Sequence, residues 1–405
     1  GGTAPAIAAI AQRAMIARAL SHPAYARTRS LIAAILCAAL AGAGFGLLMP
    51  LVSLNLEAMT GSGAVVGGNA TAAAISTIIM TPLIPFLFSR LPPRAAMAGA
   101  TIFTGLGIAA FPFLPDVYAW WVLRFVTGCA VTIIFVGSET WINQLAKPGG
   151  RASLLAVYAT VLSAGFGSGG LLLALLGSEG YAPWLAGAAI FIGGALPIAC
   201  LRGPGLVPPE AGDAGLKALV GAARLAPPAM LAGLVFGAME TAVYTLVPVY
   251  SERLGFAEFT VGLIVAAAAM GGIAMQIPIG RFADQAGRLT TLRAVAAGGV
   301  FLPLLAALAG ANLMALLPLT FLFAGLSSAF YTLGLALIGE RVQAGSLAAA
   351  NAAFIFAYGI GSLIGPPAMG AAMDGLDPFG LMIAFSALSA LYLLCAWREK
   401  DTGQD

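Results

Sequence analysis

The sequence is poor in charge, and this lack limits the class of protein more than any motif does. Only 9% of its 405 residues are charged, whereas 60% are hydrophobic. A soluble domain carries roughly 25% charged residues, so this chain cannot cover a water-facing surface with polar groups. The composition excludes a soluble globular domain and predicts an integral membrane protein.

Histidine and cysteine are too few and too scattered to build an active site or a metal site. The one histidine, His22, precedes a proline, and the four cysteines stand singly in apolar runs without a CxxC pair. Disulfide frameworks and zinc sites need paired spacings, and a Walker A sequence for ATP is absent. We therefore expect no metal, no cofactor, no nucleic-acid partner and no enzymatic activity.

Long apolar runs divide the chain into twelve segments, each long enough to cross a bilayer, for which a helix needs about 20 apolar residues. The expected spans are 31–56, 66–89, 95–114, 117–145, 152–176, 182–201, 227–250, 259–280, 291–310, 313–339, 347–373 and 378–397. The predicted fold class is an all-α integral membrane protein of twelve transmembrane helices.

The longest polar stretch lies in the middle of the chain, and we interpret it as a linker between two sets of six spans. The expected organisation is a tail at 1–30, a six-helix bundle at 31–202, a linker at 203–226, a second bundle at 227–398, and a tail at 399–405.

Basic residues give the predicted orientation. If the N-terminus is cytoplasmic, all of the 19 lysines and arginines except Arg124 and Arg253 fall in the tails and inner loops. Positive charge is enriched in cytoplasmic loops of membrane proteins. We therefore expect both termini on the cytoplasmic side, with Arg253 and a set of acidic residues in the outer loops.

The two halves carry the same features in the same order. The segments Pro85–Arg94 and Gly280–Arg288 follow the second helix of each half, and Glu139 and Glu340 end the fourth helix of each half. The matched positions lie roughly 195–200 residues apart, as expected for an internal repeat. The repeat predicts two pseudo-symmetric six-helix bundles, an architecture in which transporters place the binding site between the repeats.

Three motifs resemble those of the major facilitator superfamily. Gly280–Arg288 resembles its loop signature Gly-x-x-x-Asp-x-x-Gly-Arg, and Arg124 with Gly128 resembles its fourth-helix signature. The segment Gly361–Gly370 resembles a glycine–proline motif of its antiporters, but in span eleven instead of span five. The first-half loop departs from the signature, because Ser89 replaces the aspartate and Pro92 replaces the turn glycine.

The resemblance implies a monomeric permease in a bacterial inner membrane, in which the two bundles rock around a central site. It also implies that spans one, four, seven and ten line the central cavity. On that basis we expect secondary active transport of a small organic solute, coupled to protons. The motif in span eleven favours export.

Glu240 and Arg124 are charges without a counterpart in the other half, and both lie inside the hydrocarbon region. Their helices place Arg124 about 10 Å and Glu240 about 15 Å from the outer ends. Ionised side chains at such depths usually face a cavity, are paired, or function. Glu240 is the candidate proton- or substrate-responsive carboxylate, and Arg124 is its candidate counter-charge or an anion anchor. The alternatives are a permanent structural ion pair, or a bond from Glu240 to the helix backbone that is broken near Pro248.

Polar and aromatic residues near these charges are candidates for the cavity lining, although each is also consistent with helix-to-helix hydrogen bonding. They are Phe236, Thr241, Tyr244, Asn55, Ser327, Tyr331, Thr332, Gln276, Asn351 and Tyr358. Aromatic rings with hydroxyl groups suit a moderately apolar organic solute.

A third group of charges lies at the predicted cytoplasmic helix ends, and we expect it to form a gate. Its members are Asp284, Arg281, Arg288, Glu139, Glu340, Arg90 and Arg94. The alternative is fixed packing of loops against helices.

Two alternative functions remain open at the level of the sequence. The chain is an importer of a small organic anion or metal chelate if Arg124 grips the solute. It is a membrane sensor or scaffold without transport activity if the altered first-half loop reflects lost function.

Overall fold

The computed structural model describes residues 23–145, 151–200, 224, 226–342 and 347–399, and every regular element in these ranges is helical. Eleven stretches of this described part are long and apolar enough to cross a membrane, and α6 (Arg151–Leu176) supplies a twelfth. Within lipid, backbone N–H and C=O groups must be bonded inside the segment, so continuous apolar runs fold as helices. The predicted all-α membrane fold is confirmed.

The helices of the first half follow the predicted spans closely. They are α2 (Pro23–Thr60), α3 (Gly63–Arg90), α4 (Pro93–Ala110) with the short 3-10 helix η1 (Phe111–Phe113), α5 (Val117–Leu145), α6 and α7 (Ala182–Cys200). Helix α2 begins before the predicted start at residue 31, so the end of the predicted tail is helical. Residues 1–22 and almost all of the predicted linker 203–226 lie outside the described residues.

The second half repeats this order with one broken helix. Its helices are α9 (Pro227–Arg253), α10 (Glu258–Ala274), α11 (Gln276–Ala286), α12 (Arg288–Ala309), α13 (Leu313–Arg341), α14 (Leu347–Gly375) and α15 (Gly380–Trp397). The predicted eighth span comprises α10 and α11, which meet at Met275.

The segment Gly280–Arg288 differs in detail from a loop with two turn glycines. Gly280 lies inside α11, and the turn into α12 is made by Gly287 alone, at φ +85°. That backbone conformation is readily adopted only by glycine, so the second glycine of the segment is the one that the turn requires.

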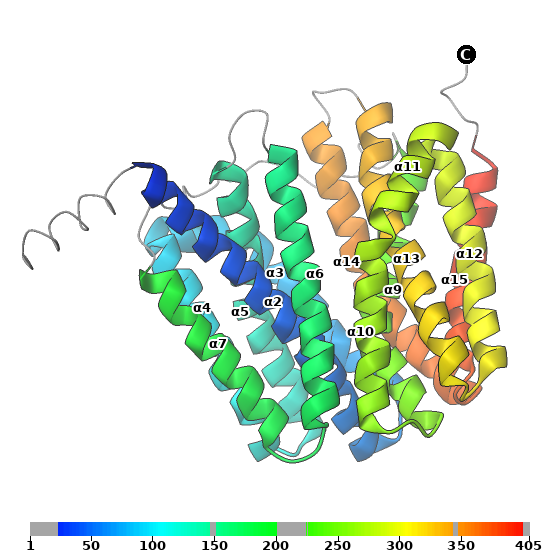
Figure 1. Ribbon diagram of the computed structural model, residues 1–405, viewed down its shortest axis with the longest axis horizontal. Helices are drawn as coiled ribbons and strands as arrows, with labels where there is room; N and C mark the ends of the chain where they lie inside the picture. Colours follow the sequence, from blue (N-terminus) through cyan, green and yellow to red (C-terminus); the bar gives the residue numbers. More distant parts are fainter. Residues whose placement is uncertain (1–22, 146–150, 201–223, 225, 343–346, 400–405) are drawn as a thin grey trace, which may run out of the picture.

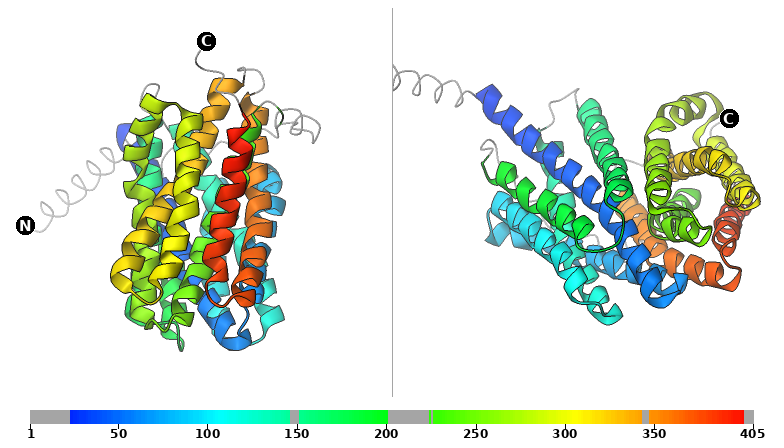
Figure 2. Two further views of the ribbon diagram at one scale, coloured as in Figure 1. Left: turned by 90° about the vertical axis from the view of Figure 1, so that its right-hand side faces the viewer. Right: turned by 60° about the horizontal axis from the view of Figure 1, so that its bottom comes forward.

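The two halves pack their helices in the same pairs (Figures 1 and 2). Helix α2 packs on α6 as α9 packs on α14, α3 on α5 as α10 on α13, and α4 on α7 as α12 on α15. The predicted repeat therefore corresponds to two bundles of equivalent internal packing.

Glycines bring α2 into backbone contact with α6, and α9 into backbone contact with α14. A methyl group on Gly46 would lie 2.1 Å from the carbonyl oxygen of Phe166, and one on Gly361 would lie 1.9 Å from that of Leu234. Small residues allow such close approach between membrane helices, where packing drives association. The high glycine content of the chain thus serves interfaces inside each bundle.

The bundles meet through α3 against α14 and α6 against α10. The close contacts gather toward one end of these helices, where Gly63 touches Gly370 and Gly262 touches Ala174. We call this the Arg253 end, after the residue that ends α9, and the opposite one the Arg288 end. In Figure 1 the first bundle leans away from the second toward the Arg288 end, which is at the top.

Candidate functional site

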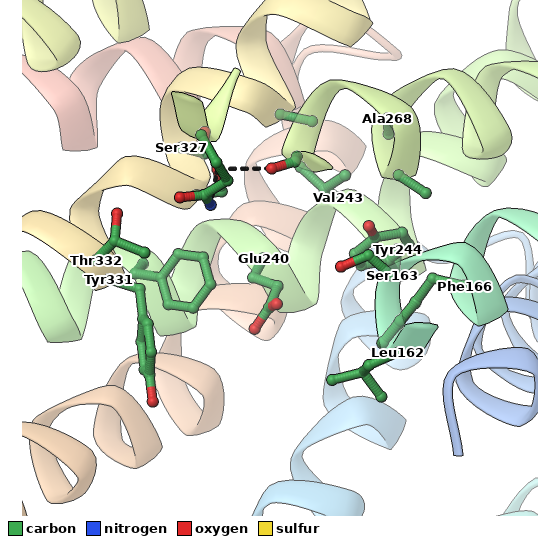
Figure 3. A pocket seen from close by; sticks show the side chains of 16 residues that line it. Leu162, Ser163, Phe166, Glu240, Val243, Tyr244, Ala268, Ser327, Tyr331 and Thr332 are labelled. Carbon is green, nitrogen blue, oxygen red and sulfur yellow. Dashed lines mark hydrogen bonds between the residues drawn. The ribbon is translucent and has the colours of Figure 1, made fainter. Parts of the chain in front are cut away.

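A cavity of about 160 Å³ lies between the two bundles, beside Glu240 (Figure 3). Side chains from α6 of the first half and from α9, α10, α11 and α13 of the second half line it. They are Leu162, Ser163, Phe166, Phe236, Glu240, Val243, Tyr244, Ala268, Ala269, Gly272, Gln276, Ala324, Ser327, Ser328, Tyr331 and Thr332. Most of the polar surface therefore comes from the second half.

Glu240 accepts a hydrogen bond from the hydroxyl group of Tyr358, at 2.9 Å. Close packing of α9 on α14 makes this bond possible: a methyl group on Gly237 would lie only 2.0 Å from the carbonyl oxygen of Tyr358. Ser362, one turn after Tyr358, donates to the carbonyl oxygen of Gly237 at 3.1 Å. The glycine contact thus sets the distance at which α14 presents its tyrosine to the carboxyl group.

Aromatic rings surround the carboxyl group. Phe236 packs against Tyr331 and Tyr358, with ring centroids 5.3 and 5.6 Å apart. On the other side of the cavity, Tyr244 packs against Phe166 of the first half at 4.9 Å. Figure 3 shows Glu240 between Tyr331 on one side and Tyr244 and Phe166 on the other. The site therefore places one acidic group in an aromatic enclosure that the two bundles build together.

Most of the predicted lining residues are placed at this cavity, and several are held by hydrogen bonds. The side-chain amide of Gln276 donates to the hydroxyl group of Ser328 at 3.0 Å. Ser327 donates to the carbonyl oxygen of Phe323 at 2.8 Å, and Tyr331 and Thr332 also line the space. These polar groups can orient a solute beside the carboxyl group.

Four predicted lining residues are not in the cavity wall: Tyr358 reaches the site only through its hydrogen bond to Glu240, and the other three lie elsewhere. Asn55 donates to the carbonyl oxygens of Leu51 and Ser178, so it ties α2 to the segment after α6. Thr241 is buried within the bundle, and Asn351 is exposed on α14. Neither Thr241 nor Asn351 belongs to the wall of the cavity around Glu240.

The structure does not bring Arg124 and Glu240 together. Arg124 is only 3% exposed, and within the described residues its side chain forms no hydrogen bond or ion pair, with the Nε atom buried and unpartnered. Arg124 is also absent from the lining of the cavity. The expected counter-charge arrangement is therefore not formed in this conformation.

The neighbours of Arg124 on its helix face lie against α3 and α4, where Thr127 would be 2.3 Å from a methyl group on Gly107. Trp121 and Gly128 share its helix face by their spacing, and both lie against α3: a methyl group on Gly68 would be 3.1 Å from the Trp121 ring, and one on Gly128 would be 2.2 Å from Ser76 Oγ. Helix depth was predicted from the sequence, but the face of α5 that meets α3 was not.

Sequence reasoning missed the contribution of α6. Ser163 and Phe166 line the cavity from the first half, and Phe166 also stacks on Phe45 with centroids 5.7 Å apart. The available signal was an aromatic residue alone among the small residues Gly165–Ser168. The pairing of α6 with α10 across the halves then directs that ring into the cavity.

At the Arg288 end, the predicted gate residues form contacts inside each half. Arg288 pairs with Glu340 at 2.6 Å and donates to the carbonyl oxygen of Ala336 at 2.9 Å. Arg94 donates to Ser30 at 2.9 Å and stacks over the ring of Trp141. One ion pair therefore forms among the predicted gate residues, and it joins α12 to α13 of the same bundle.

The other predicted gate residues are exposed at this end. Arg281 and Asp284 lie on the open face of α11, and Arg90 lies over the ring of Phe86. Glu139 is exposed on α5 and close enough to Tyr331 of the second half to influence it electrostatically. None of these positions tests the gating role, which stays a prediction.

The Arg253 end carries a charged cluster across the halves that the sequence did not reveal. Arg253 forms ion pairs of 2.8 Å with Glu57 of the first half and with Asp374 and Asp377 of the second half. Glu258, which begins α10, accepts a hydrogen bond from Ser178 of the first half. From the sequence, Arg253 was expected only to lie in an outer loop. Nothing in the sequence shows which acidic residues pair with its side chain.

Asp374 strengthens this connection by capping α3 from the other half. Its carboxylate accepts hydrogen bonds from the backbone N–H groups of Gly63 and Ala64, at 2.7 and 2.9 Å, and from the hydroxyl group of Ser62 at 2.9 Å. A carboxylate at a helix N-terminus satisfies free N–H groups and interacts favourably with the helix dipole. The Arg253 end is thus joined by ion pairs, a helix cap and glycine contacts.

Comparison with known proteins agrees with this architecture. A sequence model described as "Major Facilitator Superfamily" matches residues 34–317 and 229–404. A protein named uncharacterized MFS-type transporter YcaD, from Escherichia coli O139:H28 (strain E24377A / ETEC), is 27% identical over 327 residues. The match covers 80% of this chain and 83% of the relative, and its counterpart from Shigella sonnei (strain Ss046) matches equally.

Solved structures of transporters share the fold. The nucleoside transporter NupG superposes with a TM-score of 0.75 at 14% identity, over 93% of this chain and 100% of that one. A bacterial homologue of the human lysosomal transporter Spinster, in an inward-facing and unoccupied conformation, superposes with a TM-score of 0.70 at 14% identity, over 93% and 96%. At this identity the likeness concerns the fold.

Proposed function

We propose that this chain, which belongs to the major facilitator superfamily, is a proton-coupled secondary transporter that exports a small organic solute by alternating access. The family and the named relatives indicate a membrane transporter. The proposal adds the coupling ion, the direction and the site. Its carrying observation is Glu240, the one acidic side chain among the described residues that line the cavity between the bundles.

Glu240 has the surroundings that proton coupling requires. It lies within the membrane-spanning part of α9, where an ionised group without a partner is costly. Its described side-chain partner is the neutral hydroxyl group of Tyr358, and no lysine or arginine belongs to the described lining. A carboxyl group held in this way can exchange a proton when the cavity opens to water or admits a solute.

The charge distribution supports an orientation for the cycle. Arg90, Arg94, Arg281, Arg288 and Arg341 lie at the Arg288 end, which the preference for cytoplasmic positive charge assigns to the cytoplasm. The contacts across the halves gather at the Arg253 end, which would then face outward. We infer an arrangement that gives access from the cytoplasm, in a monomer of the bacterial inner membrane with both termini inside.

The same observations argue against the two alternatives. An importer of organic anions would need a cation at the cavity, and Arg124 is not among the residues that line it. A scaffold without transport activity would not need a polar cavity between two bundles. An inward proton gradient would favour export. A proton that reaches Glu240 from the outside would release the bound solute on that side.

The test is proton flux in proteoliposomes under an imposed pH gradient, with a panel of cationic, neutral and anionic organic solutes. We expect the wild-type chain to couple proton flux to at least one solute, and Glu240→Gln to lose this coupling while remaining folded. Glu179→Gln, at an exposed residue after α6, is the matched control. Full gradient-driven transport by Glu240→Gln contradicts the proposal, as does the absence of flux for every solute.

A further inference from the structure

The wall around Glu240 is more aromatic than proton transfer alone requires. Phe236, Tyr244 and Tyr331 of the second half and Phe166 of the first half line the same space. Their rings pack against one another and against Tyr358, so they are held in place. Aromatic rings present negative potential on their faces, and they attract cations that approach within about 6 Å.

Among the described residues, the ionisable groups that face Glu240 add no positive charge. Three of them are tyrosines, namely Tyr244 on α9, Tyr331 on α13 and Tyr358 on α14. A further acidic group, Glu139 on α5, lies near Tyr331. Within the described residues, α6, α10 and α11 contribute apolar side chains, serine and glutamine to the wall. An anion entering this space meets a carboxylate and the ring faces.

The geometry points to an organic cation, such as a substituted ammonium, as the class of solute that this site binds, with its charge against Glu240 and its apolar groups between the rings. This inference rests on the proposed function and specifies its substrate. A substituted ammonium is weakly hydrated, so it loses little on leaving water and gains both the carboxylate and the ring faces. The hydroxyl and amide groups of Ser327, Ser328 and Gln276 can hold a polar substituent of the solute.

The carboxylate of Glu240 can bind either a proton or the organic cation. Proton binding and cation binding therefore exclude each other. When a monovalent organic cation binds, the carboxyl group of Glu240 loses its proton to water, and the cavity keeps the same net charge. When a proton returns, the carboxylate is neutralised and the cation is released. One proton is exchanged for one monovalent cation without any other reactant.

The experiment compares ligands that share an aromatic ring and differ in charge. Benzyltrimethylammonium, benzyl alcohol and benzoate are bound to the purified full-length chain, together with a graded series of larger quaternary ammonium ions. We expect at least one cation to bind, more tightly as the pH rises, with a proton released for each cation bound. Glu240→Gln should weaken that cation about tenfold and remove both the pH dependence and the proton release.

Ring variants separate the aromatic wall from general folding effects. Tyr331→Leu should weaken the cation several-fold, whereas Tyr331→Phe, which keeps the ring, should bind like wild type. A loss shared by Tyr331→Leu and Tyr331→Phe would overturn the role of the ring. Thermal unfolding of each variant shows whether a loss of binding reflects a loss of fold.

The outcomes distinguish this inference from the proposed function. If no cation of the series binds, or if benzyl alcohol or benzoate binds preferentially and depends on Glu240, the inference is overturned, even when a pH gradient drives flux of another solute. If a cation binds as expected but a pH gradient drives no flux, the inference stands and proton-coupled transport fails.

Discussion

The two ends of the bundles both carry charged residues, but they use them differently. At the Arg253 end, Arg253 pairs with Glu57 of the other half, and Asp374 caps a helix of the other half. At the Arg288 end, the pair formed by Arg288 and Glu340 joins two helices of one half. Contacts across the halves must break when a transporter of this architecture opens, whereas contacts inside a half can persist.

Burial reinforces the difference between the ends. The side chains of Arg253 and Glu57 are each 12% exposed, whereas those of Arg288 and Glu340 are 33% and 49% exposed. Exposed pairs contribute about 0–1 kcal/mol, and buried pairs respond more strongly to the loss of one partner. We therefore expect the Arg253 end to determine which conformation is populated, and three substitutions test this comparison.

The largest expected effect comes from the glycine contact between α3 and α14. In Gly67→Ala, the added methyl group would lie 2.2 Å from the backbone carbonyl oxygen of Pro366, which no side-chain rotation relieves. We expect about 1–3 kcal/mol of destabilisation of the conformation closed at the Arg253 end. Distances between spin labels at the exposed positions Tyr118 and Leu376, in a background without cysteine, report the resulting separation.

The control for this prediction is Gly99→Ala in α4, where a methyl group meets nothing within 4 Å. Both substitutions replace a helical glycine with alanine, so the change in helix propensity is shared. Equal distance distributions in the two variants would contradict the view that α3 and α14 hold this end closed.

An intermediate effect is expected from Arg253→Gln. The variant leaves Glu57, Asp374 and Asp377 close together without their shared cation, so repulsion across the halves favours separation. We expect a shift of roughly 1–2 kcal/mol toward the open Arg253 end, read from the same label pair. The control Arg398→Gln removes an exposed arginine after α15 and should leave the label distances unchanged. A shift of equal size in this control would mean that the net charge of the protein, and not the cluster around Arg253, is responsible.

The smallest effect is expected from Glu340→Gln at the opposite end. This variant breaks a partly exposed pair inside one half, so it should cost about 0–1 kcal/mol of stability, less at high salt. The distance at the Arg253 end should not move. A shift as large as that of Arg253→Gln would show that the pair at the Arg288 end also controls the opposite end.

The positions of the spans and the division into halves could be predicted because they depend on properties carried along the chain. A charged or polar stretch cannot remain in lipid, so segments such as 117–145 and 313–339 were located almost to the residue. The placement of Glu240 and Arg124 within membrane-spanning helices followed for the same reason. Even the fixed turn at Gly287 was indicated by residue type, although Gly280 was not needed for it.

The direction in which each side chain faces could not be predicted in the same way. In a soluble helix, one apolar face marks the core, but the helices here are apolar on all sides because lipid is as apolar as the interior. Arg124 and Asn55 were therefore expected at the cavity, but they lie away from its wall. Phe166 was overlooked because no difference in polarity distinguishes its face of α6.

The sequence by itself determined a twelve-helix membrane protein made of two repeated halves, with one carboxyl group at the depth of the binding site. Only the tertiary structure decided that Glu240 faces aromatic rings and Tyr358, while Arg124 lies outside the cavity wall. It also decided that Arg253 collects acidic groups from both halves. The physical reason is that hydropathy fixes which segments enter the membrane, whereas contacts between small residues on different helices fix how those segments turn toward one another.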